Sequence, residues 1–193
     1  MEVAILAWDP AHKSQTRQKI LRSAGELFTL KGFKQVSIND VMTHAGLTRG
    51  AFYAHFDNKS ELYAEAIVFA AKDAKNQRLG QAQCDQASDT MAKLLQAYIS
   101  IEHAQKAQSP CPLAFLISDI GISQPQAQAS YAKVLRGLIE QLSSSSGQSM
   151  QQSMQAAIAM IGGVALARAT ADSELSQQLI DAALASAKSA INV

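Results

Sequence analysis

The side chains that could do chemistry in this sequence are few and widely spaced. Cys84 and Cys111 form neither a Cys-x-x-Cys pair nor a spacing with histidine that is typical of a metal site. His44, His55 and His103 are spread along the chain, and no known catalytic spacing unites them with Cys111. We therefore predict no metal, no cofactor and no enzymatic activity. A thiol-dependent enzyme is kept as a less favoured alternative.

Two cations occupy positions that suit an external anion. Arg49 and Lys59 fall in the first turns of predicted helices, where a cation opposes the helix dipole by about 0.3–1 kcal/mol. A bound phosphate would offset that cost. The whole chain has a net charge of only +1, but residues 1–60 hold eight Lys/Arg against five Asp/Glu, and residues 61–193 hold nine against eleven. The N-terminal end is therefore favoured for phosphate contact.

Two short helices joined by a glycine turn are predicted within residues 37–61, and they position these cations. Ser37 can cap the first helix, with Asp40 at the capping-box position. Thr48 can cap the second helix in the same manner. The turn Ala45-Gly46-Leu47 connects the first helix directly to the second, which is typical of a helix-turn-helix.

The second of these helices, predicted over residues 49–55, has a smooth outward face. At 100° per residue Phe52 falls on the opposite side from Gly50, so the aromatic ring faces the core. Small outward residues let a helix backbone approach base edges, while Tyr53 and His55 on the flanks could meet phosphates on the two walls of a groove. The alternative is a packed core helix with a solvated face.

Residues 16–66 closely resemble the N-terminal domain of TetR/AcrR-family transcriptional regulators. The resemblance rests on the segments TRQKILRSAGELFTLKGF, SINDVMTHAGLTRGAFYAHF and DNKSELYAEAI. It implies that the recognition helix faces bases or nearby phosphates and that flanking side chains hold the DNA backbone. The DNA-binding residues that we expect, in a domain of residues 16–58, are Ser37, Thr48, Arg49, Gly50, Ala51, Tyr53, His55 and Lys59.

The rest of the chain is predicted to be helical as well. The sequence is 48% hydrophobic with only 4 prolines, and no alternating strand-like run stands out, so the expected fold class is all-α. Residues 1–15 are predicted to be a mobile arm and residues 59–193 a larger ligand-binding and dimerisation domain. Predicted helices cover 16–30, 38–45, 49–55, 59–79, 150–171 and 174–191, others begin near Ser88, Pro112 and Pro125, and the serine run 143–147 is a predicted loop.

Cys111 is placed by two prolines near the start of a short apolar helix. A helix N-terminus can lower the pKa of a thiol, which would suit a sensor of electrophiles or oxidants. The alternative is a small buried hydrophobe in a tight turn. The Cys-Pro-Leu segment also resembles a branch of TetR-like regulators, some of which sense through a cysteine in this region, although Pro110 stands where that branch commonly has glycine. Candidate sensor or effector-pocket residues, for each of which an ordinary buried position is the favoured alternative, are Cys111, Phe69, Tyr98, His103, Phe115 and Tyr131.

The last two predicted helices are candidates for a dimer interface. Residues 156–167 are almost continuously apolar, so this segment must be covered on more than one side. It could form half of a four-helix interface between two copies, or it could be an internal core helix. The family resemblance favours a dimer, because TetR-like regulators usually dimerise through their last two long helices. The candidate interface residues are Ile158, Ile161, Gly162, Val164, Ala165, Leu179, Ala183 and Leu184.

The favoured function is a homodimeric, sequence-specific repressor of transcription. A two-fold dimer would present two recognition helices to double-stranded DNA about 34 Å apart or somewhat more, which implies a near-palindromic operator. An unknown small-molecule effector, or modification of a thiol, would release the operator by shifting the separation of these helices. The alternative from another class is a DNA-architectural or interaction module without an effector.

A cytoplasmic location without membrane association is expected. The apolar opening of the sequence lacks a basic start and a cleavage site, which argues against a secretory signal. The apolar run 156–167 falls short of the roughly 20 residues of a membrane-spanning helix. Two cysteines cannot form a disulfide framework, so a reducing compartment is the default.

Overall fold

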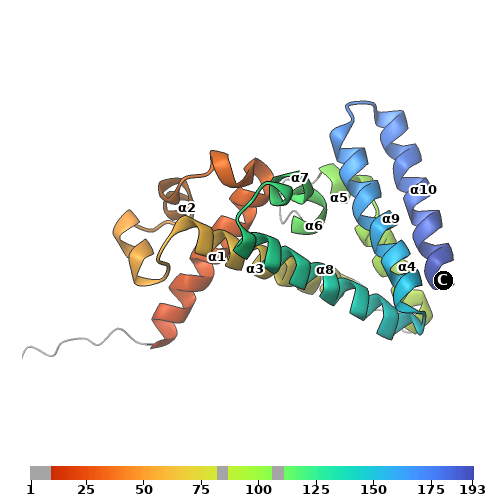
Figure 1. The fold of residues 1–193 in the computed structure, drawn as a ribbon, viewed down its shortest axis with the longest axis horizontal. Coiled ribbons are helices and arrows are strands. Elements are labelled where there is room, and N and C mark those ends of the chain that lie inside the picture. The colour runs from red at the N-terminus through yellow and green to blue at the C-terminus, as the bar shows by residue number, and fades with distance from the viewer. Residues whose placement is uncertain (1–9, 82–86, 106–110) are drawn as a thin grey trace, which may run out of the picture.

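Residues 10–81, 87–105 and 111–193 are described by the computed structural model, and every regular element in these ranges is a helix (Figure 1). The all-α prediction is confirmed. Cys84 and Pro110 lie outside the described residues. The elements are α1 (Pro10–Gln35), α2 (Ile38–His44), the 3-10 helix η1 (Arg49–Ala54), α3 (Lys59–Gln81), α4 (Ala87–Tyr98), α5 (Ile101–Gln105), α6 (Pro112–Phe115), α7 (Ile117–Gly121), α8 (Pro125–Ser146), α9 (Met150–Ala169) and α10 (Ser173–Ile191).

The N-terminal unit consists of α1, α2, η1 and the beginning of α3, which enclose one apolar cluster. Phe28 of α1 and Phe52 of η1 are at most 1% exposed, and Tyr63 of α3 packs edge-on against Phe28 with ring centroids 5.0 Å apart. Gly32 has the positive φ (78°) that a chain reversal near the end of α1 requires. Phe33 then packs back onto the cluster.

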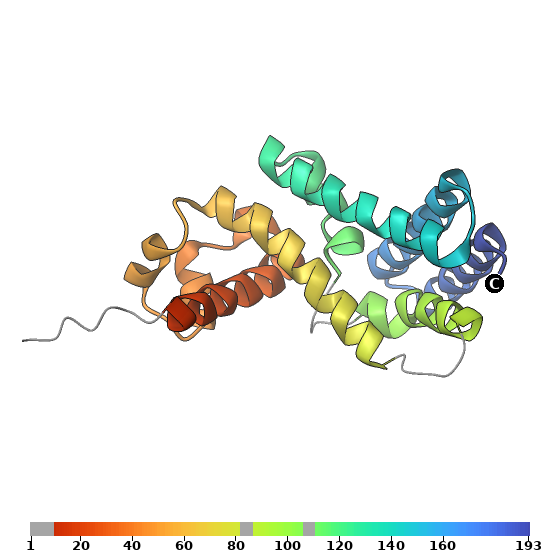
Figure 2. The ribbon, with the colours of Figure 1, turned by 90° about the horizontal axis from the view of Figure 1, so that it is seen from below.

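The larger C-terminal unit has its own apolar cluster, built mainly from α4, α6, α8, α9 and α10. Helix α3 runs from the first unit into the second, and α8 lies beside it in both views (Figures 1 and 2). Helices α9 and α10 pack as a pair at the end of the molecule opposite α2 (Figure 1). The two cores are therefore joined by the α3 and α8 layer, with the short helices α6 and α7 between them.

Three local predictions are wrong. The predicted arm does not reach residue 15, because α1 begins at Pro10, where a fixed φ and a missing N–H suit a first helical turn. Residues 143–146 of the predicted loop are instead the last turn of α8, and Gly147 (φ 70°) is the C-cap that follows it. The apolar segment after Pro112 forms two short helices rather than one, since Leu116 (φ −102°, ψ 3°) interrupts it.

No helix in the ranges that the structure covers combines the length and the apolar character that crossing a membrane requires.

Candidate DNA-binding interface and effector cavity

The capping box at the start of α2 is formed as predicted. The Ser37 hydroxyl accepts a hydrogen bond from the amide of Asp40 (3.1 Å), and the Asp40 carboxylate accepts one from the amide of Ser37 (2.8 Å). The Ser37 hydroxyl also donates to the Asp40 carboxylate (2.7 Å), and this bond, followed by the one from the Ser37 amide, holds the pKa of Asp40 below its ordinary value. The helix that precedes the turn is thus fixed at its first residue, and Gly46 (φ 69°) makes the turn that follows.

The recognition segment is shorter and more tightly wound than predicted. It is a 3-10 helix of six residues, and Thr48 sits at its N-cap without a side-chain capping hydrogen bond. The predicted Thr48 cap is therefore wrong. The first turn is closed instead through the backbone, where the amide of Ala51 donates to the carbonyl of Thr48 (3.1 Å). The exposed Thr48 hydroxyl is consequently not used to cap the helix.

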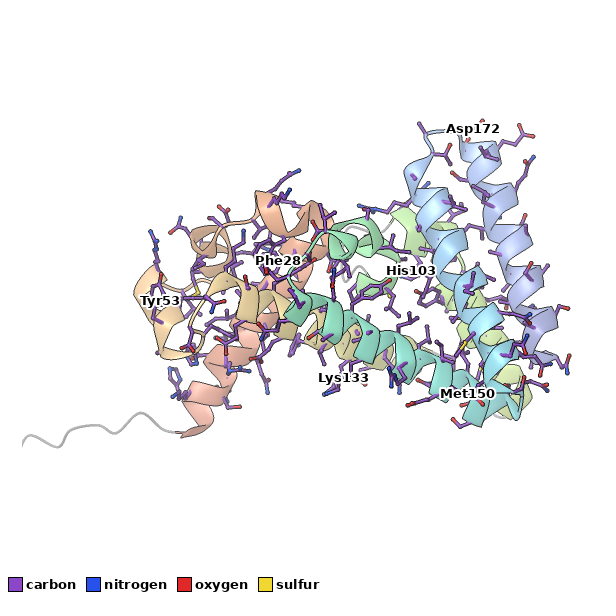
Figure 3. All side chains as sticks on the ribbon, in the orientation of Figure 1. Phe28, Tyr53, His103, Lys133, Met150 and Asp172 are labelled. Carbon is purple, nitrogen blue, oxygen red and sulfur yellow. The ribbon has the colours of Figure 1, made fainter. Side chains whose placement is uncertain are left out.

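The two faces of η1 separate as the sequence predicts. Phe52 is fully buried and Phe56, just beyond the helix, is 2% exposed. Arg49 and Gly50 are exposed, and Tyr53, with 59% of its surface exposed, stands at the outer edge of the N-terminal unit (Figure 3). A Cβ added at Gly50 would meet no atom within 4 Å. The outer surface of η1 therefore has no bulky side chain at Gly50, and the Arg49 cation and the Tyr53 phenol lie beside that position.

Two of the predicted phosphate contacts are turned toward the protein. The Lys59 ammonium lies 4.2 Å from the centroid of the Phe33 ring, and burial lowers the pKa of Lys59. Both ring nitrogens of His55 are buried without a hydrogen-bond partner among the described residues. Burial, followed by the nearby charges of Lys13 and Arg17, lowers the pKa of His55. A phosphate contact through either residue therefore requires its side chain to turn outward.

A cavity of about 290 Å³ opens among α3, α4, α6, α8 and α9. Two of the six predicted pocket or sensor residues, Tyr98 and Cys111, line it. The other four are placed elsewhere. Phe69 packs against the N-terminal cluster, the Tyr131 hydroxyl donates to the carbonyl of Leu113 (2.6 Å), and His103 and Phe115 stack on each other with ring centroids 6.1 Å apart.

Cys111 has features of both alternatives predicted from the sequence, a sensor thiol and a small buried hydrophobe. It is the N-cap of α6 and is only 2% exposed, as a buried structural residue would be. Its sulfur also lines the cavity wall and lies 3.4 Å from the Tyr98 hydroxyl. Cys111 is therefore part of the cavity wall, although it is almost completely buried.

The family model for bacterial regulatory proteins of the tetR family matches residues 20–66, which span the helix-turn-helix described above. The chain belongs to the TetR family. An uncharacterised HTH-type transcriptional regulator of Lactococcus lactis is 28% identical over 81% of this chain and 85% of its own length. The AcrR regulator of Shigella flexneri is 45% identical over 26% of this chain. That match covers only 24% of the AcrR sequence.

The whole fold is also found among solved structures. Reduced NemR from E. coli superposes with a TM-score of 0.74 over 91% of this chain and 97% of that chain, at 18% identity. The TetR-family protein described here is accordingly a transcriptional regulator with an N-terminal DNA-binding helix-turn-helix and a larger helical domain. The relatives named above are regulators of transcription and not enzymes.

The predicted dimer residues of this TetR-family chain divide into two groups. Ile161, Val164 and Ala183 are at most 9% exposed and belong to the protomer's own core. Ile158 is 72% exposed, and Gly162, Ala165, Leu179 and Leu184 are partly exposed. The sequence could not separate these groups, because both faces of α9 are apolar and only the position of α10 decides which face is inside.

The structure also brings together three lysines that the sequence analysis missed. Lys72 and Lys75 of α3 and Lys133 of α8 all line the cavity, although about sixty residues separate the two helices in the chain. Figure 3 places Lys133 along α8 in the middle of the molecule. The spacing of Lys72 and Lys75 puts them on one helical face, but only the pairing of α3 with α8 reveals their common site.

Proposed function

We propose that this TetR-family protein is a dimeric, sequence-specific repressor that leaves its operator when a small molecule enters the cavity or when Cys111 is modified. The observation that carries the proposal is the outward surface of η1. Its core side is fixed by Phe52, while Gly50 leaves room for close approach of a DNA backbone or base edge. Arg49 beside it supplies the cation that a phosphate would pair with.

The contact set that we propose remains the predicted one. Thr48, Arg49, Gly50 and Ala51 face bases or nearby phosphates, and Tyr53 contacts the backbone at the edge of the groove. Ser37, His55 and Lys59 complete the set, the last two after their side chains turn outward. Domain limits near residues 58 and 59 are proposed as well, with α3 starting at Lys59, contributing to the N-terminal core and continuing along the wall of the cavity.

An exposed apolar stripe on α9 supports dimerisation. Met154, Ile158 and Leu166 share one helical face and are 46%, 72% and 56% exposed. Leu175 on the neighbouring helix α10 is 44% exposed. Scattered exposed apolar residues are ordinary, but a stripe along a helix pair fits a two-fold four-helix interface. Such a dimer would place two copies of η1 on one near-palindromic duplex in the cytoplasm.

The dimer is tested by a matched pair of charge insertions. Ile158→Glu should convert the dimer to a monomer in analytical ultracentrifugation and weaken operator binding. Ile122→Glu is the control, because Ile122 is equally exposed (73%) but follows α7, away from the stripe. A dimer that survives Ile158→Glu, or one that is lost in both variants, would contradict this interface.

The function as a whole is tested by footprinting the full chain on the DNA beside its own gene. We expect protection of a near-palindromic site, which disappears on adding a suitable small molecule or an electrophile. Cys111→Ser should keep DNA affinity and, if the thiol is the switch, lose only the response to electrophiles. Binding without sequence preference would instead favour the architectural module, and loss of a catalytic turnover on Cys111→Ser would favour the enzyme.

A further inference from the structure

We infer that the cavity selects amphipathic organic anions, meaning molecules with a compact apolar body and one carboxylate or comparable acidic head. This inference rests on the proposed function only in taking the cavity as the effector site. It follows from how charge and apolar surface are distributed over the residues that form the cavity wall.

The charged part of the wall is entirely basic. Lys72, Lys75 and Lys133 are the ionisable amines of the lining, and none of the lining residues is an Asp or a Glu. All three lysines line the cavity and are nevertheless exposed, so they border its opening to solvent, where their stems can cover apolar surface. Among the described residues none of the three takes part in a salt bridge. Their charges are therefore available to a ligand.

The interior of the cavity is apolar. Leu95, Leu113 and Leu142 are at most 4% exposed and line its depth, together with Met160. A charged head placed among these side chains would lose its hydration without compensation. A ligand with an apolar tail can instead bury the tail against the leucines and leave its head at the mouth.

The position of the lysines determines which charge the head group of the ligand must carry. A carboxylate at the mouth can pair with ammonium groups from α3 on one side and α8 on the other. An ammonium head in the same place would be repelled by all three lysines, and an alcohol would gain no charge pairing. Because each exposed pair contributes little by itself, three together correspond to a preference of about tenfold.

The first experiment compares three probes of equal chain length by isothermal titration calorimetry on the full chain at neutral pH. Octanoate should bind about tenfold more tightly than 1-octanol, and octylammonium should bind most weakly. Equal affinities, a preference for octylammonium, or no binding of any probe would overturn the inference.

Variants then assign the effect to the site. Lys72→Gln combined with Lys133→Gln should remove the preference for octanoate over 1-octanol while both probes still bind. Arg136→Gln is the matched control, because Arg136 is an exposed cation on the same helix α8 but does not line the cavity. An unchanged preference in the double variant, or an equal loss in the control, would overturn the inference.

A cavity-filling variant tests the apolar part. Gly137 lines the cavity within α8, and a Cβ at this position meets no atom within 4 Å. Gly137→Leu should fold with unchanged or raised thermal stability and should weaken binding of octanoate and 1-octanol alike. Unchanged affinity for both probes would place them outside this cavity.

The outcomes keep this inference separate from the proposed function. A protein that binds its operator but shows no anion preference disproves the inference alone. A protein that prefers octanoate but binds no specific DNA disproves the proposed function and leaves the ligand class standing.

Discussion

The hydroxyl of Tyr63 on α3 donates a hydrogen bond to the carboxylate of Asp119 on α7 (2.5 Å). The same carboxylate oxygen accepts from the amide of Phe33 at the end of α1 (3.2 Å). A Cβ at Gly32 would lie 3.1 Å from the other Asp119 oxygen, so the chain reversal and the carboxylate are closely fitted. Asp119 thus joins the DNA-binding unit to the short helices that begin at the cavity.

Removing the Tyr63 hydroxyl should cost more stability than removing a comparable hydroxyl elsewhere. Tyr63→Phe deletes a largely buried hydrogen bond to a carboxylate, which corresponds to about 1.5–3 kcal/mol of the free energy of unfolding. Tyr131→Phe deletes a bond to the neutral carbonyl of Leu113, worth about 0.5–1.5 kcal/mol. Urea denaturation of both variants measures the difference, and a smaller loss for Tyr63→Phe would contradict this role of Asp119.

The two cap positions of the helix-turn-helix should respond differently to alanine. Ser37→Ala removes a formed capping box and should lower the free energy of unfolding by about 1 kcal/mol. Thr48→Ala removes no capping bond and should leave stability nearly unchanged while weakening DNA binding. Thermal denaturation and a binding titration separate the two effects. A stability loss of similar size in both variants would mean that Thr48 caps η1 after all.

Alanine substitutions at the two adjacent glycines of α9 should change stability in opposite directions. A Cβ at Gly163 would overlap the Ala183 side chain of α10, so Gly163→Ala must push the two helices apart and should destabilise the fold by about 1–3 kcal/mol. A Cβ at Gly162 meets nothing within 4 Å in the protomer, and Gly162→Ala should gain about 0.5–1 kcal/mol through helix propensity. Denaturant titrations decide the signs, and a neutral Gly163→Ala would refute the close packing.

Acidification should weaken the fold through His55. Burial lowers the pKa of His55 in the folded chain, whereas the unfolded histidine binds its proton near pH 6.5. Below that pH the unfolded chain binds more protons, so His55 contributes stability above pH 6.5 that is lost as the pH falls through the lowered folded pKa. The melting temperature should drop more between pH 7.5 and pH 5.5 in the wild type than in His55→Leu. Equal drops would show that His55 is protonated equally in both states.

The features predicted well from the sequence are those determined by neighbours in the chain. The Ser37 capping box, the Gly46 turn and the burial of Phe52 depend on residues within a few positions of each other, so residue type and spacing are sufficient. The same locality explains why the ends of α9 and α10 fall within about two residues of the prediction.

The features that were missed depend on tertiary packing. Serine favours loops by itself, but α8 continues through residues 143–146, where the Ser146 hydroxyl bonds back to the carbonyl of Leu142 (2.7 Å). The basic mouth of the cavity arises only because α8 brings Lys133 to α3. Aromatic candidates such as Phe69 were plausible by residue type, and only the packing of the helices assigns them to a core instead.

The open face of η1 is expected to read DNA sequence. The most direct measurement selects duplexes from a random pool and compares the affinity for the enriched site with that for a scrambled duplex at physiological salt. The wild type should prefer the enriched site by about a thousandfold or more. Gly50→Leu should stay folded but lose that preference, whereas Gly121→Leu, another substitution into open space, should retain it. Equal affinity of the wild type for both duplexes would contradict the claim.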